Sequence, residues 1–462
     1  MLQYNMSMNE NDTICSLATA TGGALCIIRI SGKDAVSIVC KTCGGISINT
    51  PANTILHTDF CDNNGDIIDD VMVSVFRAPH SYTGENSVEI SCHGSRYIAG
   101  RIIETLIAHG CRQAMPGEYT QRAFLNGKLG LEQAEAVADL IASTNAATHK
   151  MALSQLRGSI SSELLALREQ LLRMTSLLEL ELDFSDHEDI EFADRSELLS
   201  LAVEIDMKIQ KLAHSFETGN AIKHGIPVAI IGKTNVGKST LLNRLIKDER
   251  AIVSDVHGTT RDTIEDTMDI KGVQFRFIDT AGIRHTTDKI EKIGIDRTYQ
   301  AIEKARIVLW VIDEQPTDEE FENILKRTED KSVIIVRNKI DKNSIPVNIE
   351  YIYSKRLLSV EISAKKGTGI ENLEKHIFNS ANIPIFTEND VIITSARHYE
   401  ALLKAHIEIS HAIKGLKQGI SGDLVAENLR MVLYNLSKIT GKGIITPDET
   451  LHTIFNDFCI GK

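Results

Sequence analysis

The segment Gly232–Ser239 constrains this chain more than any other. It reads G-K-T-N-V-G-K-S and fits the phosphate-binding pattern G-x-x-x-x-G-K-[ST]. The apolar run 228–231 before it predicts a buried strand, and the spacing of the leucines after it predicts a helix. In such a unit the backbone N–H groups and the helix N-terminus surround a β-phosphate, while the lysine neutralises phosphate charge and the serine meets Mg²⁺. The segment therefore predicts a nucleoside triphosphate site, and taken alone it is compatible with many kinds of nucleoside triphosphatase.

Three further motifs follow in chain order, each after a run that predicts a strand. Asp279–Gly282 offers a carboxylate to the water shell of Mg²⁺ and a glycine N–H to the γ-phosphate. Asn338–Asp341 ends in a carboxylate that can accept two N–H bonds from guanine, which adenine does not offer in that geometry. Ser363–Lys365 can reach the guanine oxygen through its backbone. The four motifs together predict a GTP site in which Asn338 bonds the guanine edge and Lys339 covers the ring.

The residue after the second motif is Ile283, where Ras-like enzymes carry a glutamine that positions water. An aliphatic side chain cannot orient water, so either another side chain does so or hydrolysis is very slow. Arg261 and Arg284 are candidates for an internal arginine finger by position, but each is equally a candidate for a solvated surface arginine.

Several segments outside these motifs carry a family resemblance. Residues 251–262 contain G-T-T-R-D and resemble the first switch of the Era-like GTPases. The whole chain is similar to the MnmE (TrmE) family of tRNA-modification GTPases, through Ser81–Glu85, Cys92–Gly94, Pro116–Leu129 and Phe458–Lys462. The resemblance implies an α/β multidomain protein with an N-terminal α+β folate-binding domain and a discontinuous helical domain. It also implies an inserted Ras-like P-loop GTPase domain with a mostly parallel sheet.

The implied domains have the following bounds. Residues 1–128 form the tetrahydrofolate-binding and dimerisation domain, 129–222 the first part of the helical domain, 223–380 the Era-like GTPase domain, and 381–462 the second helical part with the C-terminal Cys-Ile-Gly-Lys motif. The resemblance also implies a K⁺-activated GTPase that works as a homodimer with an FAD- and NADH-using partner, MnmG (GidA). Together they would add an aminomethyl or carboxymethylaminomethyl group to the 5-position of the wobble uridine in certain tRNAs. The one-carbon donor would be 5,10-methylene- or 5-formyl-tetrahydrofolate.

The resemblance assigns roles to individual residues. The side chain of Asn235 and the carbonyls of Ser254, Val256 and Thr259 would ligate K⁺, and Ser239 and Thr260 would ligate Mg²⁺. The implied GTP-binding residues are Asn235, Val236, Gly237, Lys238, Ser239, Thr240, Ser254, Asp255, Val256, His257, Gly258, Thr259, Thr260, Asp279, Thr280, Ala281, Gly282, Asn338, Lys339, Asp341, Ser363, Ala364 and Lys365.

Catalytic roles would fall to Lys238, which contacts phosphate, and to Glu291, which would orient the attacking water that Ile283 cannot. From the residues alone, a solvated carboxylate at a helix start is the simpler interpretation of Glu291. Cys459 is either a nucleophile near the one-carbon site or a packed residue that positions Lys462.

Folate would contact Arg29, Glu85, Lys128 and Lys462. A pteridine offers N–H groups that suit a carboxylate, and the glutamate tail of a folate suits lysine or arginine. Spacing alone also allows Glu85 and Lys128 to be ordinary turn residues. The loop 18–23 departs from the family pattern, because it lacks the family's arginine and is shorter, which puts in doubt any folate or dimer contact made by that loop.

Composition limits the classes of protein. A chain of 462 residues predicts two to four domains. No apolar run approaches the length of a membrane span, the first twelve residues are polar, and the cysteines are mostly single, so we expect a cytoplasmic protein with reduced thiols and no membrane partner. The net charge of −13 argues against a broadly basic surface, so a tRNA would need positive charge from the partner protein or from a local patch.

Proline-free stretches predict the helical parts. Apolar residues from Leu153 to Leu178 recur at three- and four-residue steps, which predicts one long amphipathic helix. Val425–Leu436 repeats the pattern, with Ser421 as a cap and Gly441 as a stop. We expect these two seams to cover each other across the inserted GTPase domain.

An alternative function remains open from the GTPase motifs alone. The chain could be an Era-like regulatory or ribosome-assembly switch without modification chemistry of its own. The N-terminal motifs and Phe458–Lys462 favour the tRNA-modification hypothesis.

Overall fold

The computed structural model describes residues 12–183, 195–247, 266–278, 299–342, 357–383 and 390–441. These residues fall into two compact units. The first draws on residues 1–141, 155–203 and 404–462, and the second on residues 142–154 and 204–403.

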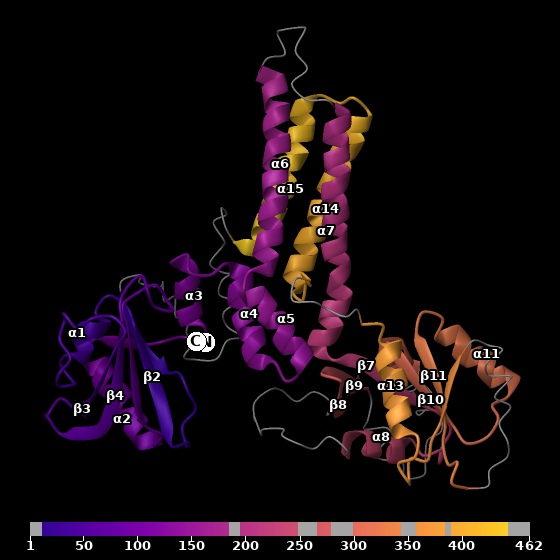
Figure 1. The fold of residues 1–462 in the computed structure, drawn as a ribbon, viewed down its shortest axis with the longest axis horizontal. Coiled ribbons are helices and arrows are strands. Elements are labelled where there is room, and N and C mark those ends of the chain that lie inside the picture. The colour runs from indigo at the N-terminus through magenta and orange to yellow at the C-terminus, as the bar shows by residue number, and fades with distance from the viewer. Residues whose placement is uncertain are drawn as a thin grey trace, which may run out of the picture. The chain divides into compact units, whose positions relative to one another are not determined.

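The first unit contains a six-stranded sheet in the order β3-β4-β5-β2-β1-β6. All neighbours are antiparallel except β1 and β6, which are parallel. Helices α1 and α2 contact this sheet (Figure 1). The elements are β1 (Thr13–Leu17), β2 (Leu25–Ser31), α1 (Ala35–Val39), β3 (Thr54–Cys61), β4 (Ile67–Phe76), β5 (Ser87–His93), α2 (Arg96–Ala108), β6 (Cys111–Gln113) and α3 (Glu118–Leu125).

Alternation of apolar residues builds the core of this unit. Ile28 and Ile30 of β2, Val73 of β4 and Ile90 of β5 are fully buried with Leu106 of α2. A strand with one covered face needs an apolar residue only at every second position, which is why the sequence pattern identifies these strands. The sequence pattern predicts strands over residues 24–30, 67–76 and 88–92. The second is confirmed at both ends, and the other two differ from the observed strands by one residue at each end.

A further set of helices comes from two chain segments, one before and one after the residues that form the second sheet. They are α4 (Leu131–Ala142), α5 (Ala146–Leu156), α6 (Ser159–Asp183), α7 (Arg195–His224), α14 (Ala396–Lys417) and α15 (Gly422–Thr440). Helices α6 and α15 pack along each other, as predicted for seams that flank an inserted domain (Figure 1).

The prediction of one helix from Leu153 to Leu178 was wrong. Gly158 adopts φ +85° and separates α5 from α6. The apolar period continues across this break, so periodicity could not reveal it, whereas the glycine adopts the left-handed backbone at little cost. The seam itself is buried in α6, through Ile160, Leu164, Leu167, Leu171, Met174 and Leu178.

Both predicted ends of α15 are confirmed by the backbone. Ser421 occupies the N-cap position, but its side chain makes no capping bond. Gly441 ends the helix with φ +69°, in the left-handed conformation that a C-terminal glycine provides.

The second unit contains a sheet in the order β12-β11-β10-β7-β9-β8, parallel except for the β8–β9 pair. Alternate residues of β10 belong to two separate apolar clusters, Leu309 to one and Trp310 to the other, so both sheet faces are covered. This confirms the predicted α/β class. The elements are β7 (Ile226–Ile231), α8 (Lys238–Lys247), β8 (Asp266–Ile270), β9 (Val273–Phe277), β10 (Ile307–Ile312), α11 (Asp318–Arg327), β11 (Ser332–Arg337), β12 (Leu358–Glu361) and α13 (Ile370–Ser380).

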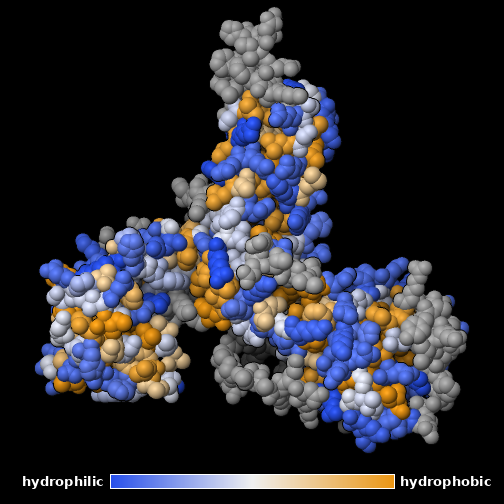
Figure 2. Space-filling view, viewed as in Figure 1, coloured by the Kyte–Doolittle hydropathy of each residue, from blue (hydrophilic) through white to orange (hydrophobic). Residues whose placement is uncertain are grey.

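Polar surface dominates the long helices. Figure 2 shows hydrophilic residues over much of their visible face, with apolar residues interspersed. Within the described parts of the chain, no helix is both long and apolar enough to cross a membrane.

Two helical glycines predict opposite effects of alanine on stability. A Cβ at Gly219 of α7 would lie 2.2 Å from the carbonyl oxygen of Ile393, whereas a Cβ at Gly100 of α2 meets nothing within 4 Å. We expect Gly219→Ala to destabilise its unit by about 1–3 kcal/mol through overpacking. We expect Gly100→Ala to stabilise its unit by about 0.5–1 kcal/mol through helix propensity. Calorimetric unfolding of both variants checks this, and a stabilised Gly219→Ala protein would contradict the close approach.

Candidate functional site

The phosphate loop begins directly after β7 and is shaped by two glycines. Gly232 has φ +143°, and a Cβ there would lie 2.2 Å from the carbonyl oxygen of Val311. Gly237 has φ +100°, and its Cβ would lie 2.2 Å from Nδ2 of Asn338. Both positions therefore require glycine, for the backbone angle and for the close approach of neighbouring segments.

Asn235 lies between these glycines and is exposed. It has φ +63°, and asparagine tolerates this left-handed conformation better than most residues. The exposed carboxamide at this point of the loop fits the predicted role of a cation ligand.

Lys238 begins α8, and Ser239 and Thr240 follow it in the first turn. Its ammonium donates to the carbonyl oxygens of Gly232 and Lys233, each at 2.6 Å. Burial lowers the pKa of this ammonium. A bound phosphate would favour the charged form, and an ammonium has a third N–H to donate to it.

Asn338 joins the phosphate loop to the loop after β12. Its side chain is buried, donates from Nδ2 to the carbonyl oxygen of Val236 at 2.8 Å, and accepts from the N–H of Ala364 at 3.0 Å. The predicted guanine contact of Asn338 stays a prediction, and the second N–H of the amide is the group that could make it. What the structure assigns to Asn338 is the connection between the two loops.

Two other residues of the Asn338–Asp341 motif are held in place by side chains from neighbouring loops. Asp341 accepts a 2.7 Å bond from the hydroxyl of Ser363, and this bond is the main cause that lowers the pKa of the Asp341 carboxyl. Lys339 has φ +67°, and its ammonium pairs with Asp313 at 2.7 Å. The carboxyl ends of β10, β11 and β12 thus bring Asp313, the Asn338–Asp341 motif and Ser363 together.

The other predicted nucleotide, metal and catalytic residues lie outside the described residues. They are Ser254, Asp255, Val256, His257, Gly258, Thr259, Thr260, Asp279, Thr280, Ala281, Gly282 and Glu291, and so are Arg261, Ile283, Arg284, Cys459 and Lys462.

In the first unit, three of the predicted folate contacts lie in or beside the loop between β4 and β5. The guanidinium of Arg29 lies 5.4 Å from the ring centre of Tyr82 and pairs with Glu89 at 2.8 Å. A Cβ on Gly84 would lie 3.3 Å from Cγ of Lys128, so the stem of that lysine packs against the loop. Glu85 belongs to the same loop, which therefore brings Arg29, Glu85 and Lys128 into one region.

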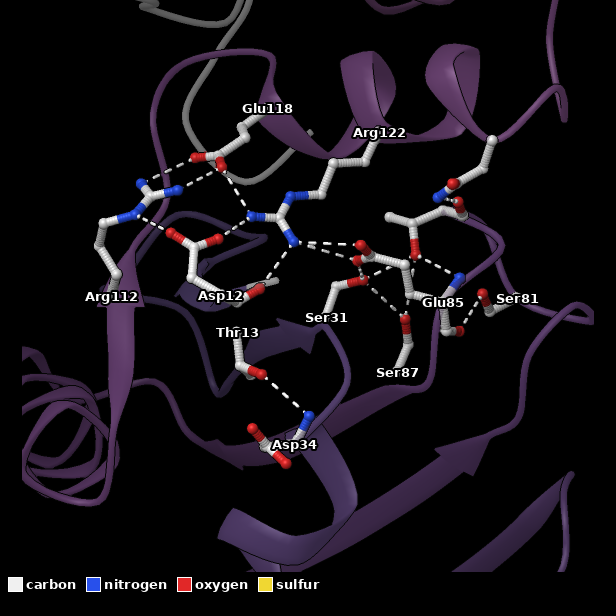
Figure 3. A network of polar contacts seen from close by, with 12 residues as sticks. Asp12, Thr13, Ser31, Asp34, Ser81, Glu85, Ser87, Arg112, Glu118 and Arg122 are labelled. Carbon is white, nitrogen blue, oxygen red and sulfur yellow. Dashed lines mark hydrogen bonds and ion pairs between the residues drawn. The ribbon is translucent and has the colours of Figure 1, made fainter. Parts of the chain in front are cut away.

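Glu85 ends a chain of charged residues (Figure 3). Arg122 of α3 donates to both carboxylate oxygens of Glu85, at 3.1 and 3.3 Å, and also to Asp12 and Glu118. Arg112 of β6 donates to Asp12 and Glu118 from the other end. Burial alone would raise the pKa of the Asp12 carboxyl, but the bonds from the two arginines outweigh burial and lower it. We call these five residues the Arg122 network.

Sequence reasoning missed the Arg122 network as a functional feature. Glu118 and Arg122 stood in the segment that carried the family resemblance, without a role of their own. Their four-residue spacing on a helix, with opposite charges, was the available signal. Asp12 and Arg112 are distant in sequence, and only the pairing of β1 with β6 brings them near α3.

The loop 18–23 is anchored to the Cys92–Gly94 motif. The N–H of Gly22 donates to the carbonyl oxygen of Gly94 at 2.8 Å, and the N–H of Gly94 donates to that of Ala24 at 3.1 Å. A Cβ on Gly94 would lie 2.0 Å from the carbonyl oxygen of Gly23. The loop is thus fixed by backbone bonds despite its departure from the family pattern.

The parallel sheet and its loops define a phosphate-loop GTPase domain. A model of the MnmE helical domain matches residues 131–459, and a model of the N-terminus of the GTP-binding protein TrmE matches residues 13–128. The chain belongs to the MnmE family of tRNA modification GTPases.

Relatives named tRNA modification GTPase MnmE match almost the whole chain. The protein of Phocaeicola vulgatus is 51% identical over 500 residues, covering 99% of this chain and 100% of the relative. The protein of Bacteroides thetaiotaomicron is 51% identical over 469 residues, covering 98% and 100%. Among solved structures, the G domain of the T. maritima FeoB iron transporter is 26% identical, covering 34% of this chain and 98% of that chain, with a TM-score of 0.26 that is too low to inform the fold.

The two hydrogen bonds of the Asn338 side chain lead to a prediction about nucleotide affinity. Asn338→Ala would leave the buried carbonyl of Val236 and N–H of Ala364 unpaired, so we expect the Kd values for GTP and GDP to rise about tenfold or more. Titration with fluorescent nucleotides measures this. Lys366→Ala, an exposed position beside the same loop, is the matched control and should bind as the parent does. Unchanged affinity in Asn338→Ala would show that the connection does not shape the site.

Proposed function

We propose that this chain is a K⁺-activated GTPase that acts on tRNA together with an FAD-dependent partner, MnmG. The complex adds an aminomethyl or carboxymethylaminomethyl group to the 5-position of the wobble uridine. Family membership supports GTP hydrolysis coupled to tRNA modification. The observation that carries the GTPase part is the meeting of the phosphate loop, Asn338, Asp341 and Ser363 at one edge of a parallel sheet.

Within this proposal, discrimination for guanine rests on Asp341. The bond from Ser363 keeps its carboxylate ionised and oriented. When the wrong base is bound, it does not offer paired N–H donors, and the carboxylate stays desolvated and unpaired. This is a strong basis for rejection of that base. Asp313 holds the ammonium of Lys339, so that the lysine stem can lie over the base.

Hydrolysis is assigned to residues around the phosphates. Ser239 and Thr260 hold Mg²⁺, and Asn235 with the carbonyls of Ser254, Val256 and Thr259 holds K⁺. A fixed cation there stabilises the negative charge that develops on the phosphates, as an arginine finger would. Glu291 orients the attacking water in place of the glutamine that Ile283 replaces.

One-carbon chemistry is assigned to the first unit. Arg29, Glu85 and Lys128 hold 5,10-methylene- or 5-formyl-tetrahydrofolate, with Lys462 as a further contact. The support is that the first three lie around one loop, where a carboxylate, two cations and the ring of Tyr82 suit a heterocycle with an acidic tail. Cys459 serves either as nucleophile or as a packed residue.

The wider assembly is part of the same proposal. The chain works as a cytoplasmic homodimer, with residues 1–128 as the folate and dimerisation domain, 129–222 and 381–462 as the helical domain, and 223–380 as the GTPase domain. MnmG supplies FAD and NADH chemistry. Because the chain carries a net charge of −13, MnmG or a local basic patch of this chain supplies most of the positive surface for tRNA.

Asn235 separates nucleotide binding from activation by K⁺. We expect Asn235→Ala to lose K⁺ stimulation of GTP hydrolysis with little loss of GTP affinity. Because Asn235 has φ +63°, alanine also adds backbone strain, so Asn235→Gly is the matched variant that removes the side chain alone. Hydrolysis assayed in K⁺ against Na⁺ measures the effect. Full K⁺ stimulation in both variants would remove the assigned role.

Binding of folate distinguishes tRNA modification from a purely regulatory switch. We expect a calorimetric titration of the full chain with 5-formyl-tetrahydrofolate to show saturable heat. We expect Glu85→Gln to weaken binding about tenfold or more, because the amide cannot accept both N–H groups of the pteridine. Absence of heat with the parent protein, together with normal wobble uridines in cells lacking it, would favour the switch.

A further inference from the structure

Glu85 carries the unbalanced charge of the Arg122 network. Three carboxylates, those of Asp12, Glu85 and Glu118, share two guanidinium groups, those of Arg112 and Arg122. Asp12 and Glu118 each contact both arginines, whereas Arg122 is the one arginine of the network that contacts Glu85. The network as a whole is one positive charge short, and the shortfall lies at its Glu85 end.

Glu118 and Arg122 form the buried centre of the network, whereas Asp12 (23% exposed), Arg112 (24% exposed) and Glu85 are its partly exposed members. The side chain of Glu118 is 0% exposed and that of Arg122 is 8% exposed, whereas that of Glu85 is 19% exposed. An arginine held by three carboxylates in a buried site cannot turn away to another partner. Arginines bond both carboxylate oxygens of Asp12, whereas Glu85 has a single arginine partner in the network. Arg122 is therefore a fixed support for a partly exposed carboxylate that can still accept N–H groups from a ligand.

Other bonds fix the position of Glu85 as well. Ser31 donates to Oε2 of Glu85 at 2.7 Å, and Ser81 donates to its backbone carbonyl at 2.6 Å. The N–H of Glu85 donates to the hydroxyl of Thr83 at 3.2 Å. With backbone and side chain both held, the carboxylate is oriented before any ligand arrives, and preorganised groups lose less entropy on binding.

The neighbouring groups indicate the chemistry of the ligand. A carboxylate with oxygen lone pairs still to share takes adjacent N–H donors. The ring of Tyr82 in the same loop is partly exposed, lies beside the guanidinium of Arg29, and offers a flat surface for stacking. A planar heterocycle with paired N–H groups, such as the pterin of a folate, combines these two features.

We infer that Arg122 is a positioning residue for folate binding: held by Asp12 and Glu118, it fixes the Glu85 carboxylate that receives the N–H groups of the pterin. This inference rests on the folate part of the proposed function and adds a residue that makes no contact with the ligand. Ser31 supports the same carboxylate from β2. Arg112 completes the far end of the network and supports Arg122 only indirectly.

A double-mutant cycle on the full chain tests this inference. Calorimetric titration with 5-formyl-tetrahydrofolate is compared for the parent, Arg122→Gln, Glu85→Gln and the double variant. We expect Arg122→Gln to raise Kd about tenfold or more, because it removes a charge-assisted support. We expect the double variant to bind as Glu85→Gln does, because a residue that acts through Glu85 has no effect once that carboxylate is absent.

Controls separate positioning from folding. Arg112→Gln removes an arginine from the same network without touching Glu85, so we expect a smaller change in Kd than for Arg122→Gln. If Arg122→Gln does not fold, as judged by circular dichroism and thermal unfolding, Ser31→Ala decides, and we expect a rise in Kd of several-fold, about the size of one lost hydrogen bond.

The outcomes are distinct. If the parent shows no heat, the folate part of the proposed function fails and the inference fails with it. If the parent binds and Arg122→Gln binds equally well, or if the losses from Arg122→Gln and Glu85→Gln add in full, the inference alone is overturned. Unchanged binding in Ser31→Ala, where that variant has to decide, overturns it too.

Discussion

The bridge made by Asn338 is the interaction on which the nucleotide site depends. One buried amide bonds the backbone of the phosphate loop on one side and that of the Ser363 loop on the other. The two loops are more than a hundred residues apart in sequence, and they meet because parallel strands place their carboxyl ends at one sheet edge. The glycine at position 237 allows the approach, because any side chain there would collide with the amide.

The same edge positions the groups that would read the base. Ser363 donates to Asp341, and Asp313 holds Lys339. Each contact joins residues that follow different strands, so neither contact could be predicted from local sequence. The sheet is therefore more than a support, because its strand order β12-β11-β10-β7 decides which polar residues become neighbours.

In the first unit, ion pairs join residues that are far apart in the sequence. Its sheet is antiparallel apart from the β1–β6 pair, and that pair carries Arg112 toward Asp12 and α3. Buried ion pairs of this kind add little net stability, because desolvation offsets much of the attraction. Their effect is to hold Arg122 in one place, and Arg122 in turn bonds both carboxylate oxygens of Glu85.

The sequence by itself determined the strands with alternating burial, the α/β class and the identity of the nucleotide motifs, because these follow from local periods and short spacings. It did not determine where α5 ends and α6 begins, since the apolar seam runs across Gly158 without interruption. Only the tertiary structure decided that Asn338 connects two loops and that Arg122 supports Glu85. Both depend on contacts between segments far apart in the chain, and a hydrogen bond or ion pair of that kind leaves no period in the sequence to be read.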